Sequence, residues 1–159
     1  MKKILTLMLL ALPLFAMVSC SDDNDLPDVD FRITFDNATR TDDGSVYVVQ
    51  GETFTVSSIE VINNENKNAI ITNANYYWDY FYLGSSVQPP FAFEISLEES
   101  TPLGNHVLQI ECPVYAEDKE PATALVQCNI VVVASADDIP ENGTAAFTVH
   151  PSTSSTAAD

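Results

Sequence analysis

Basic residues are scarce in this chain of 159 residues, which has 6 Lys and Arg against 23 Asp and Glu and a formal net charge of −17. Two of the six, Lys2 and Lys3, stand at the N-terminus. Beyond Cys20 only four remain against all 23 acidic residues, so that part carries a side-chain charge of −19. Nucleic-acid binding needs clustered Lys and Arg, so we expect no nucleic-acid partner. We attribute the negative surface to solubility and to spacing from a like-charged envelope.

Histidine is scarcer still, with His106 and His150 the only two. A zinc site or a nucleophile–base pair would have to be built on them. The sequence has no His-x-x-x-His spacing and no Gly-x-Ser-x-Gly elbow. Neither Cys112 nor Cys128 has a histidine or a cation near it in sequence. We therefore expect no enzyme, no metal site and no cofactor, and two ordinary surface histidines.

Short acidic clusters occur at residues 22–25, 42–43 and 137–138. Carboxylate and amide oxygens are ligands that calcium prefers. The clusters lack the glycine at the sixth place and the glutamate at the twelfth that a calcium loop carries. We expect them to be solvated loops.

Long apolar runs are also absent, apart from residues 4–19, which follow Lys2 and Lys3. This run is shorter than the about 20 residues that a spanning helix needs. A positive start, a short apolar run and small residues at its end predict a secretory signal. The run closes on Met17-Val18-Ser19-Cys20, which resembles the bacterial lipobox. The resemblance implies that residues 1–19 are a cleaved signal peptide and that Cys20 is lipidated. The alternative is a plain signal peptide with an incidental cysteine.

The residues after Cys20 read Ser-Asp-Asp-Asn-Asp. They resemble the acidic stretch of Bacteroides-type surface lipoproteins, where it serves as an export address. The resemblance implies an outer-membrane protein exposed on the cell surface and held by its lipid, since two or more acyl chains anchor stably. We expect residues 20–28 to form an acidic linker. The alternative for the acidic stretch itself is a solvated part of this linker without an export role.

No stretch after the signal shows a sustained helical period. Short alternating apolar runs separated by turn residues predict an all-β fold of about seven strands, a β-sandwich over residues 29–135. The expected strands are residues 31–35, 46–49, 54–62, 69–83, 91–97, 107–115 and 123–134. Residues 69–83 would form one long strand, or two with a bulge near Asn75. Residues 136–159 are expected to form a mobile tail. Its apolar segment 145–149 could add a strand to a sheet edge.

Two segments carry a resemblance to bacterial immunoglobulin-like domains. One is the aromatic run Tyr76-Tyr77-Trp78-Asp79-Tyr80, and the other is the turn and strand start from Pro102 to Leu108. The resemblance implies a single immunoglobulin-like β-sandwich, whose size of about 100 residues fits the expected domain. Such a fold hosts many unrelated functions, so function must be argued from a site.

Cys112 and Cys128 each fall on the apolar side of their expected strand by the period of two. A hairpin that turns about residue 120 would place them directly opposite each other, close to disulfide geometry. The chain leaves the cytoplasm, so oxidation is allowed. We predict a disulfide, with two buried free thiols as the alternative.

Six aromatic residues lie within residues 76–82. On a continuous strand, Tyr77, Asp79 and Phe81 share one face, and Asp79 marks that face as the wetter one. An exposed aromatic pair beside a carboxylate suits a sugar ligand. The alternative is a central strand whose aromatics belong to the core.

These observations favour a non-enzymatic envelope lipoprotein that binds or assembles with a glycan or another envelope protein. A glycan-binding role in a polysaccharide-uptake system is one form of this hypothesis. The competing hypothesis is a small hydrolase-like envelope enzyme. It would need a cleft with convergent polar groups of shifted pKa.

Overall fold

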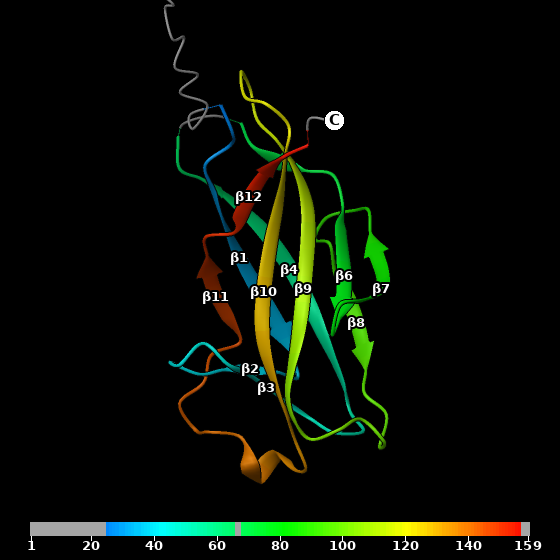
Figure 1. The fold of residues 1–159 in the computed structure, drawn as a ribbon. Helices are drawn as coiled ribbons and strands as arrows, with labels where there is room; N and C mark the ends of the chain where they lie inside the picture. Colours follow the sequence, from blue (N-terminus) through cyan, green and yellow to red (C-terminus); the bar gives the residue numbers. More distant parts are fainter. Residues whose placement is uncertain (1–24, 66–67, 157–159) are drawn as a thin grey trace, which may run out of the picture.

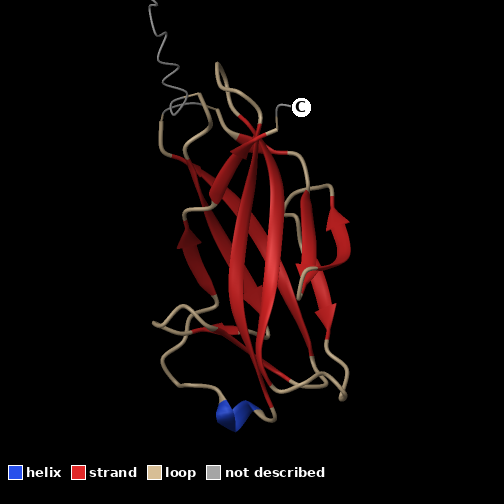
Figure 2. Cartoon of the chain, viewed as in Figure 1, coloured by secondary structure: helices blue, strands red, loops and turns tan. Residues whose placement is uncertain are grey.

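The computed structural model describes residues 25–65 and 68–156. Cys20, the signal peptide and the acidic stretch as far as Asn24 lie outside the described residues. Within the described ranges no helix has the length and apolar character to cross a membrane. Apart from one 3-10 turn at Ala136–Asp138, the regular structure of this part of the chain is strand (Figure 2).

The strands form two sheets (Figure 1). Sheet A has the order β11 (Ala146–Val149), β1 (Val29–Asp36), β4 (Thr53–Asn63) and β8 (Phe93–Ser96). Sheet B has the order β2 (Thr39–Arg40), β3 (Val46–Val49), β10 (Ala122–Val133), β9 (Gly104–Tyr115), β6 (Ala74–Trp78) and β7 (Phe81–Ser86). Two short strands join sheet B, where β12 (Ser152–Ser155) pairs with β10 and β5 (Ile70–Ile71) pairs with β9. Neighbouring strands are antiparallel except β3 and β10, which are parallel.

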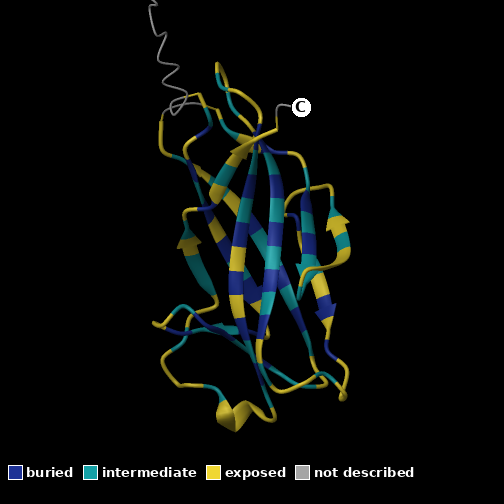
Figure 3. Cartoon of the chain, in the orientation of Figure 1, coloured by how far each residue is buried: buried dark blue, intermediate teal, exposed yellow. Residues whose placement is uncertain are grey.

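The core lies between the two sheets, where β1, β9 and β10 bury alternate residues. In β1, Phe31, Ile33 and Phe35 are buried and the residues between them are not. The same alternation runs along all twelve residues of β9 and of β10 (Figure 3). A period of two places successive side chains on opposite faces, so one face of each sheet is apolar and the other meets water. The prediction of an all-β immunoglobulin-like sandwich is confirmed.

The C-terminal segment belongs to this domain as far as Ser155, so the expectation of a mobile tail beyond residue 135 is wrong for that stretch. The strand expected at residues 145–149 is present as β11. It pairs with β1 on the side of β1 that faces away from β4. Phe147 of β11 stacks on Phe35 at a ring-centroid distance of 5.9 Å. After a short crossing, β12 pairs with residues 122–125 of β10 in the other sheet. The polar sequence of β12 offers no apolar period, and its place in sheet B comes from its pairing with β10.

The predicted disulfide between Cys112 and Cys128 is wrong. The β9–β10 hairpin turns about residue 118, so Cys112 faces Ala124 and Cys128 faces Leu108. The two cysteines are therefore four residues apart along the strands, roughly 13 Å, whereas a disulfide needs Cα atoms within about 7 Å. Both are buried free thiols, and burial raises the pKa of each to about 12. The alternative of buried thiols therefore holds.

Residues 69–83 do not form one long strand. They contain β5, β6 and the first half of β7, and the chain reverses at Asp79-Tyr80 between β6 and β7. Both turn residues have positive φ, 48° for Asp79 and 70° for Tyr80, as a two-residue type I′ hairpin requires. Asp-Tyr lacks the glycine that usually marks such a turn, so the sequence pattern did not reveal it. The reversal decides where every aromatic side chain of this segment points.

Candidate ligand-binding face

Part of the aromatic segment is core. Tyr76 is fully buried and stacks on Phe93 with ring centroids 4.5 Å apart. Its hydroxyl donates a hydrogen bond to the carbonyl of Phe91, and burial raises its pKa above the usual value of 10. Trp78 lies on the same side and packs against Phe54 at 6.2 Å. The core alternative for the aromatics therefore holds for these two side chains.

Tyr77 points to the opposite, outer face of sheet B. It lies opposite Tyr82 of β7 on one side and opposite Gln109 of β9 on the other. Gln109 in turn lies opposite Gln127 of β10. Directly opposed residues share a face, so four side chains from four adjacent strands form one line across the sheet. We call Tyr82, Tyr77, Gln109 and Gln127 the cross-strand row. With strands about 4.8 Å apart, the row spans roughly 14 Å.

The two aromatic rings of the row form a pair. The ring centroids of Tyr77 and Tyr82 are 5.5 Å apart at an interplanar angle of 62°, an edge-to-face contact. Tyr82 has 59% of its surface exposed, and Gln127 at the other end of the row is also exposed. Tyr77 and Gln109 between them are half-buried. The row thus presents ring surface at one end and amide groups at the other.

A second line of residues runs beside the row on the same face, made of Ser85, Asn75, Glu111 and Leu125. Glu111 stands diagonally across from Tyr77 on the neighbouring strand. Burial raises the pKa of Tyr77, and the charge and hydrogen bond of Glu111 raise it further. The Tyr77 hydroxyl therefore stays protonated at neutral pH and can donate a hydrogen bond. Glu111 is the one charged side chain in these two lines.

The sequence prediction that Tyr77, Asp79 and Phe81 share a face is wrong. Phe81 lies opposite Trp78, on the other side of the hairpin from Tyr77, and exposes 77% of its surface. The aromatic partner of Tyr77 is Tyr82 instead. The turn at Asp79 is the physical reason, because it reverses the strand before the expected alternation can continue. Only the strand register could have identified Gln109 and Gln127.

The carboxylate of Asp79, whose side chain is 39% exposed, is directed toward the start of β9. Its Oδ2 lies 2.6 Å from Nδ1 of His106, and its Oδ1 accepts the Val107 backbone amide at 2.9 Å. His106 exposes only 9% of its surface and stacks on Trp78 at 5.0 Å. Its Nε2 lies 2.8 Å from the Pro102 carbonyl oxygen. The expectation that His106 is an ordinary surface histidine is wrong.

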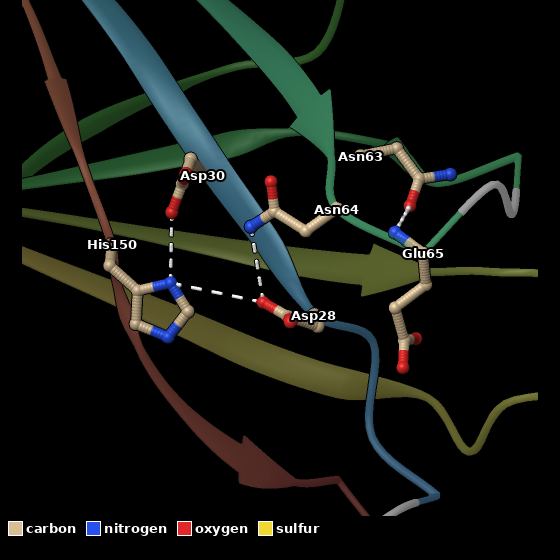
Figure 4. A network of polar contacts seen from close by, with 6 residues as sticks. All are labelled: Asp28, Asp30, Asn63, Asn64, Glu65 and His150. Atoms are coloured by element: carbon tan, nitrogen blue, oxygen red, sulfur yellow. Dashed lines mark hydrogen bonds and ion pairs between the residues drawn. The ribbon is translucent and has the colours of Figure 1, made fainter.

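His150 does lie on the surface, in the link between β11 and β12 (Figure 4). Its Nδ1 is 2.8 Å from Asp30 and 3.9 Å from Asp28. Asn64 donates to Asp28 at 3.1 Å. This network ties the C-terminal segment to β1. Among the residues that the structure describes, no three His, Cys, Asp or Glu side chains are arranged to hold a metal ion.

Two hollows lie elsewhere on the molecule. One is lined by Asp25, Leu26, Glu120 and Ser155. The other, near the start of β2, includes Asp36 and Glu52, and both of these carboxylates are exposed. Exposed carboxylates in an open hollow keep their water, whereas acid–base chemistry is favoured where burial shifts a pKa.

Comparison with known proteins adds little to this geometry. No protein-family model matches the chain, and no curated protein matches it. A solved structure of fibronectin(III)-like modules of CbhA from Clostridium thermocellum is similar at 16% sequence identity, with a TM-score of 0.44. The match covers 69% of this chain and 48% of that one, so the chain spans about half the length of that structure.

Proposed function

We propose that this protein is a non-enzymatic module of the bacterial cell envelope, anchored by a lipid on Cys20, that binds a neutral glycan on the outer face of sheet B. The observation that carries the proposal is the cross-strand row. Tyrosine rings offer an apolar surface to the C–H faces of sugar rings. The amides of Gln109 and Gln127 can each donate to and accept from sugar hydroxyls.

Charge supports a neutral ligand. A chain with a net charge of −17 repels anionic polymers before they reach the surface. The face itself has Glu111 as its one carboxylate in the two lines of residues, and its charge raises the pKa of the neighbouring Tyr77. A cationic ligand would find no further acidic side chain in these lines. An uncharged chain of sugars longer than one ring matches both the composition of the row and its length.

The proposal of a lipid anchor rests on the lipobox resemblance at residues 17–20 and on the acidic stretch after it. Eight residues separate Cys20 from Val29 at the start of β1. At about 3.4 Å per extended residue they reach at most roughly 30 Å. The face would then stand close to the outer membrane, as in a Bacteroides-type surface lipoprotein of a polysaccharide-uptake system.

The binding proposal is tested with the full-length lipidated protein in detergent micelles and a panel of neutral polysaccharides: starch, a β-glucan, a xylan and a mannan. We expect wild type to bind at least one of them. Tyr82→Ala and Gln127→Ala should each weaken that binding about tenfold, or about 1.4 kcal/mol. Both side chains are exposed, so neither change should lower the melting temperature appreciably.

Tyr115→Ala is the matched control. Tyr115 is an exposed tyrosine on the same face of β9, six residues from Gln109 and so roughly 20 Å from the row. The Tyr115→Ala variant should bind the polysaccharide with wild-type affinity. Loss of affinity in Tyr115→Ala equal to that in Tyr82→Ala would contradict the site, and absence of binding to every polysaccharide would contradict the function.

The anchor is tested separately with Cys20→Ser. We expect this variant to leave the membrane fraction and to incorporate no labelled palmitate, because the thiol that carries the lipid is gone. Wild type, grown and fractionated in parallel, should stay in the membrane fraction and incorporate labelled palmitate. A Cys20→Ser protein that still fractionates with the envelope and still takes up palmitate would refute lipidation at this residue.

A further inference from the structure

The turn between β6 and β7 is held to β9 by three hydrogen bonds that converge on Asp79. The Asp79 amide donates to the Val107 carbonyl at 2.9 Å. Its carboxylate accepts from the Val107 amide at 2.9 Å and lies 2.6 Å from Nδ1 of His106. The turn connects Tyr77 to Tyr82, the aromatic pair of the cross-strand row. These bonds therefore set where the two rings stand relative to each other.

The turn needs such support because its backbone is unfavourable. Asp79 and Tyr80 both adopt positive φ without being glycine. A left-handed conformation at such residues costs free energy and persists only where the surroundings impose it. A weaker hold on Asp79 would let the turn relax and would shift Tyr82 relative to Tyr77.

Both ring nitrogens of His106 face groups that accept hydrogen bonds. Nδ1 faces the Asp79 carboxylate at 2.6 Å, and Nε2 faces the Pro102 carbonyl oxygen at 2.8 Å. A neutral imidazole has one N–H and one lone pair, so it can satisfy only one of these acceptors. The imidazolium form donates to both. The contacts of His106 therefore match its doubly protonated state.

We propose that His106 is a positioning residue for the binding face, and that only its protonated form holds the β6–β7 turn in the geometry that the cross-strand row requires. Proton loss breaks one of the two hydrogen bonds and places a lone pair against an oxygen. The turn then loosens while the sandwich stays folded. The consequence for ligand affinity rests on the proposed glycan function. The hold of protonated His106 on the turn, which we call the clamp, does not depend on that function.

The charges around His106 support this assignment. Asp79 faces it from the β6–β7 turn, Trp78 stacks on the ring at 5.0 Å, and uncharged Ile130 lies opposite it on β10. In the loop before β9, Glu98 accepts a hydrogen bond from Ser100, and the side chain of Glu99 lies toward Gly51. Asp79 is thus the charged side chain that the described contacts bring to the ring.

The pKa of His106 determines the pH range in which the clamp forms. Burial lowers the pKa of His106, but the Asp79 hydrogen bond, the Pro102 hydrogen bond and the Asp79 charge outweigh it, so the pKa is raised above 6.5. The clamp is therefore fully present below about pH 6.5, the value of the unfolded chain. It is lost as pH rises through the higher pKa of the folded protein.

The chain supplies its own probe, because Trp78 is its one tryptophan. An imidazolium stacked on an indole quenches its fluorescence, whereas a neutral imidazole quenches it much less. In full-length protein without ligand, we expect tryptophan fluorescence to rise from pH 5 to pH 9 with a midpoint above 6.5. His106→Gln should remove this transition, and His150→Gln, which replaces the only other histidine, should leave it unchanged.

Glutamine can donate to Asp79 without titrating, so His106→Gln also serves as a rescue variant. For a polysaccharide that wild type binds at pH 6, we expect wild-type affinity to fall several-fold by pH 9 and His106→Gln affinity to stay level. A fluorescence midpoint at or below 6.5, or a transition that survives in His106→Gln, would overturn the clamp. If His106→Gln fails to fold, NMR of the ring in His150→Gln decides, since a neutral ring at pH 6.5 refutes the proposal. Failure of every polysaccharide to bind would refute the function and leave the fluorescence result to judge the clamp.

Discussion

Cys112 and Cys128 show how the core controls the chemistry of single side chains. Both lie between the sheets, and burial raises the pKa of each thiol to about 12. The thiolate is the reactive form, so burial disfavours reaction of either cysteine near neutral pH. They pack as small apolar side chains.

We predict that the mature lipidated protein has two thiols that do not react with a thiol reagent while it is folded. Both should react at once after unfolding in guanidinium without reductant, because no disulfide has to be broken. Counting thiols before and after unfolding measures this. Fewer than two thiols in the unfolded, unreduced protein would mean that the cysteines are oxidised.

Among the strands, β11 makes the largest difference to the boundary of the domain. Its Phe147 stacks on Phe35 and lies under the guanidinium of Arg40, whose Cζ is 4.5 Å from the ring centroid. Arg40 comes from β2 of sheet B, so this ring joins the two sheets at one edge. The strand therefore closes the sandwich as well as extending sheet A.

Replacing Phe147 with Ala should destabilise the protein by about 2–4 kcal/mol, because it removes aromatic packing from a partly buried position and the cation–π contact. Thr148→Ala, at the exposed neighbouring position of the same strand, should change stability by less than about 0.5 kcal/mol. Urea unfolding of both variants measures the difference. Equal midpoints for Phe147→Ala and wild type would show that β11 is not part of the folded domain.

Across the whole molecule, the excess of acidic residues is the dominant electrostatic feature. A net charge of −17 destabilises the compact state by self-repulsion. Salt screens charges on the surface, and at 0.15 M the screening length is about 8 Å. The same repulsion opposes the approach of further copies of the chain and of anionic polymers.

We therefore expect the melting temperature at pH 7 to rise by several degrees between 10 mM and 500 mM NaCl. A protein of this size gains roughly 2–5 °C per kcal/mol of stability. Scanning calorimetry at fixed pH measures the effect, and an equal concentration of an uncharged osmolyte shows how much is not electrostatic. A melting temperature that falls with NaCl would show that attractive ion pairs outweigh the net charge.

The amino-acid sequence by itself determined which side chains face the core. Period-two alternation in residues 31–35, 107–115 and 123–134 predicted the buried face of β1, β9 and β10, because the pleat of a strand depends only on local backbone geometry. The apolar composition of residues 145–149 indicated the added edge strand, which is present as β11. Sequence composition alone also defined the acidic surface.

Tertiary structure decided everything that depends on register and on reversal of the chain. The hairpin between β9 and β10 turns two residues earlier than expected, which separates Cys112 from Cys128. The turn at Asp79 has no glycine to announce it and exists because His106 and Val107, far along the chain, hold its carboxylate. The cross-strand row unites four strands, so no single segment contains it. Alternation is a local property, whereas register is the sum of contacts between distant segments, and the candidate binding face is made by register.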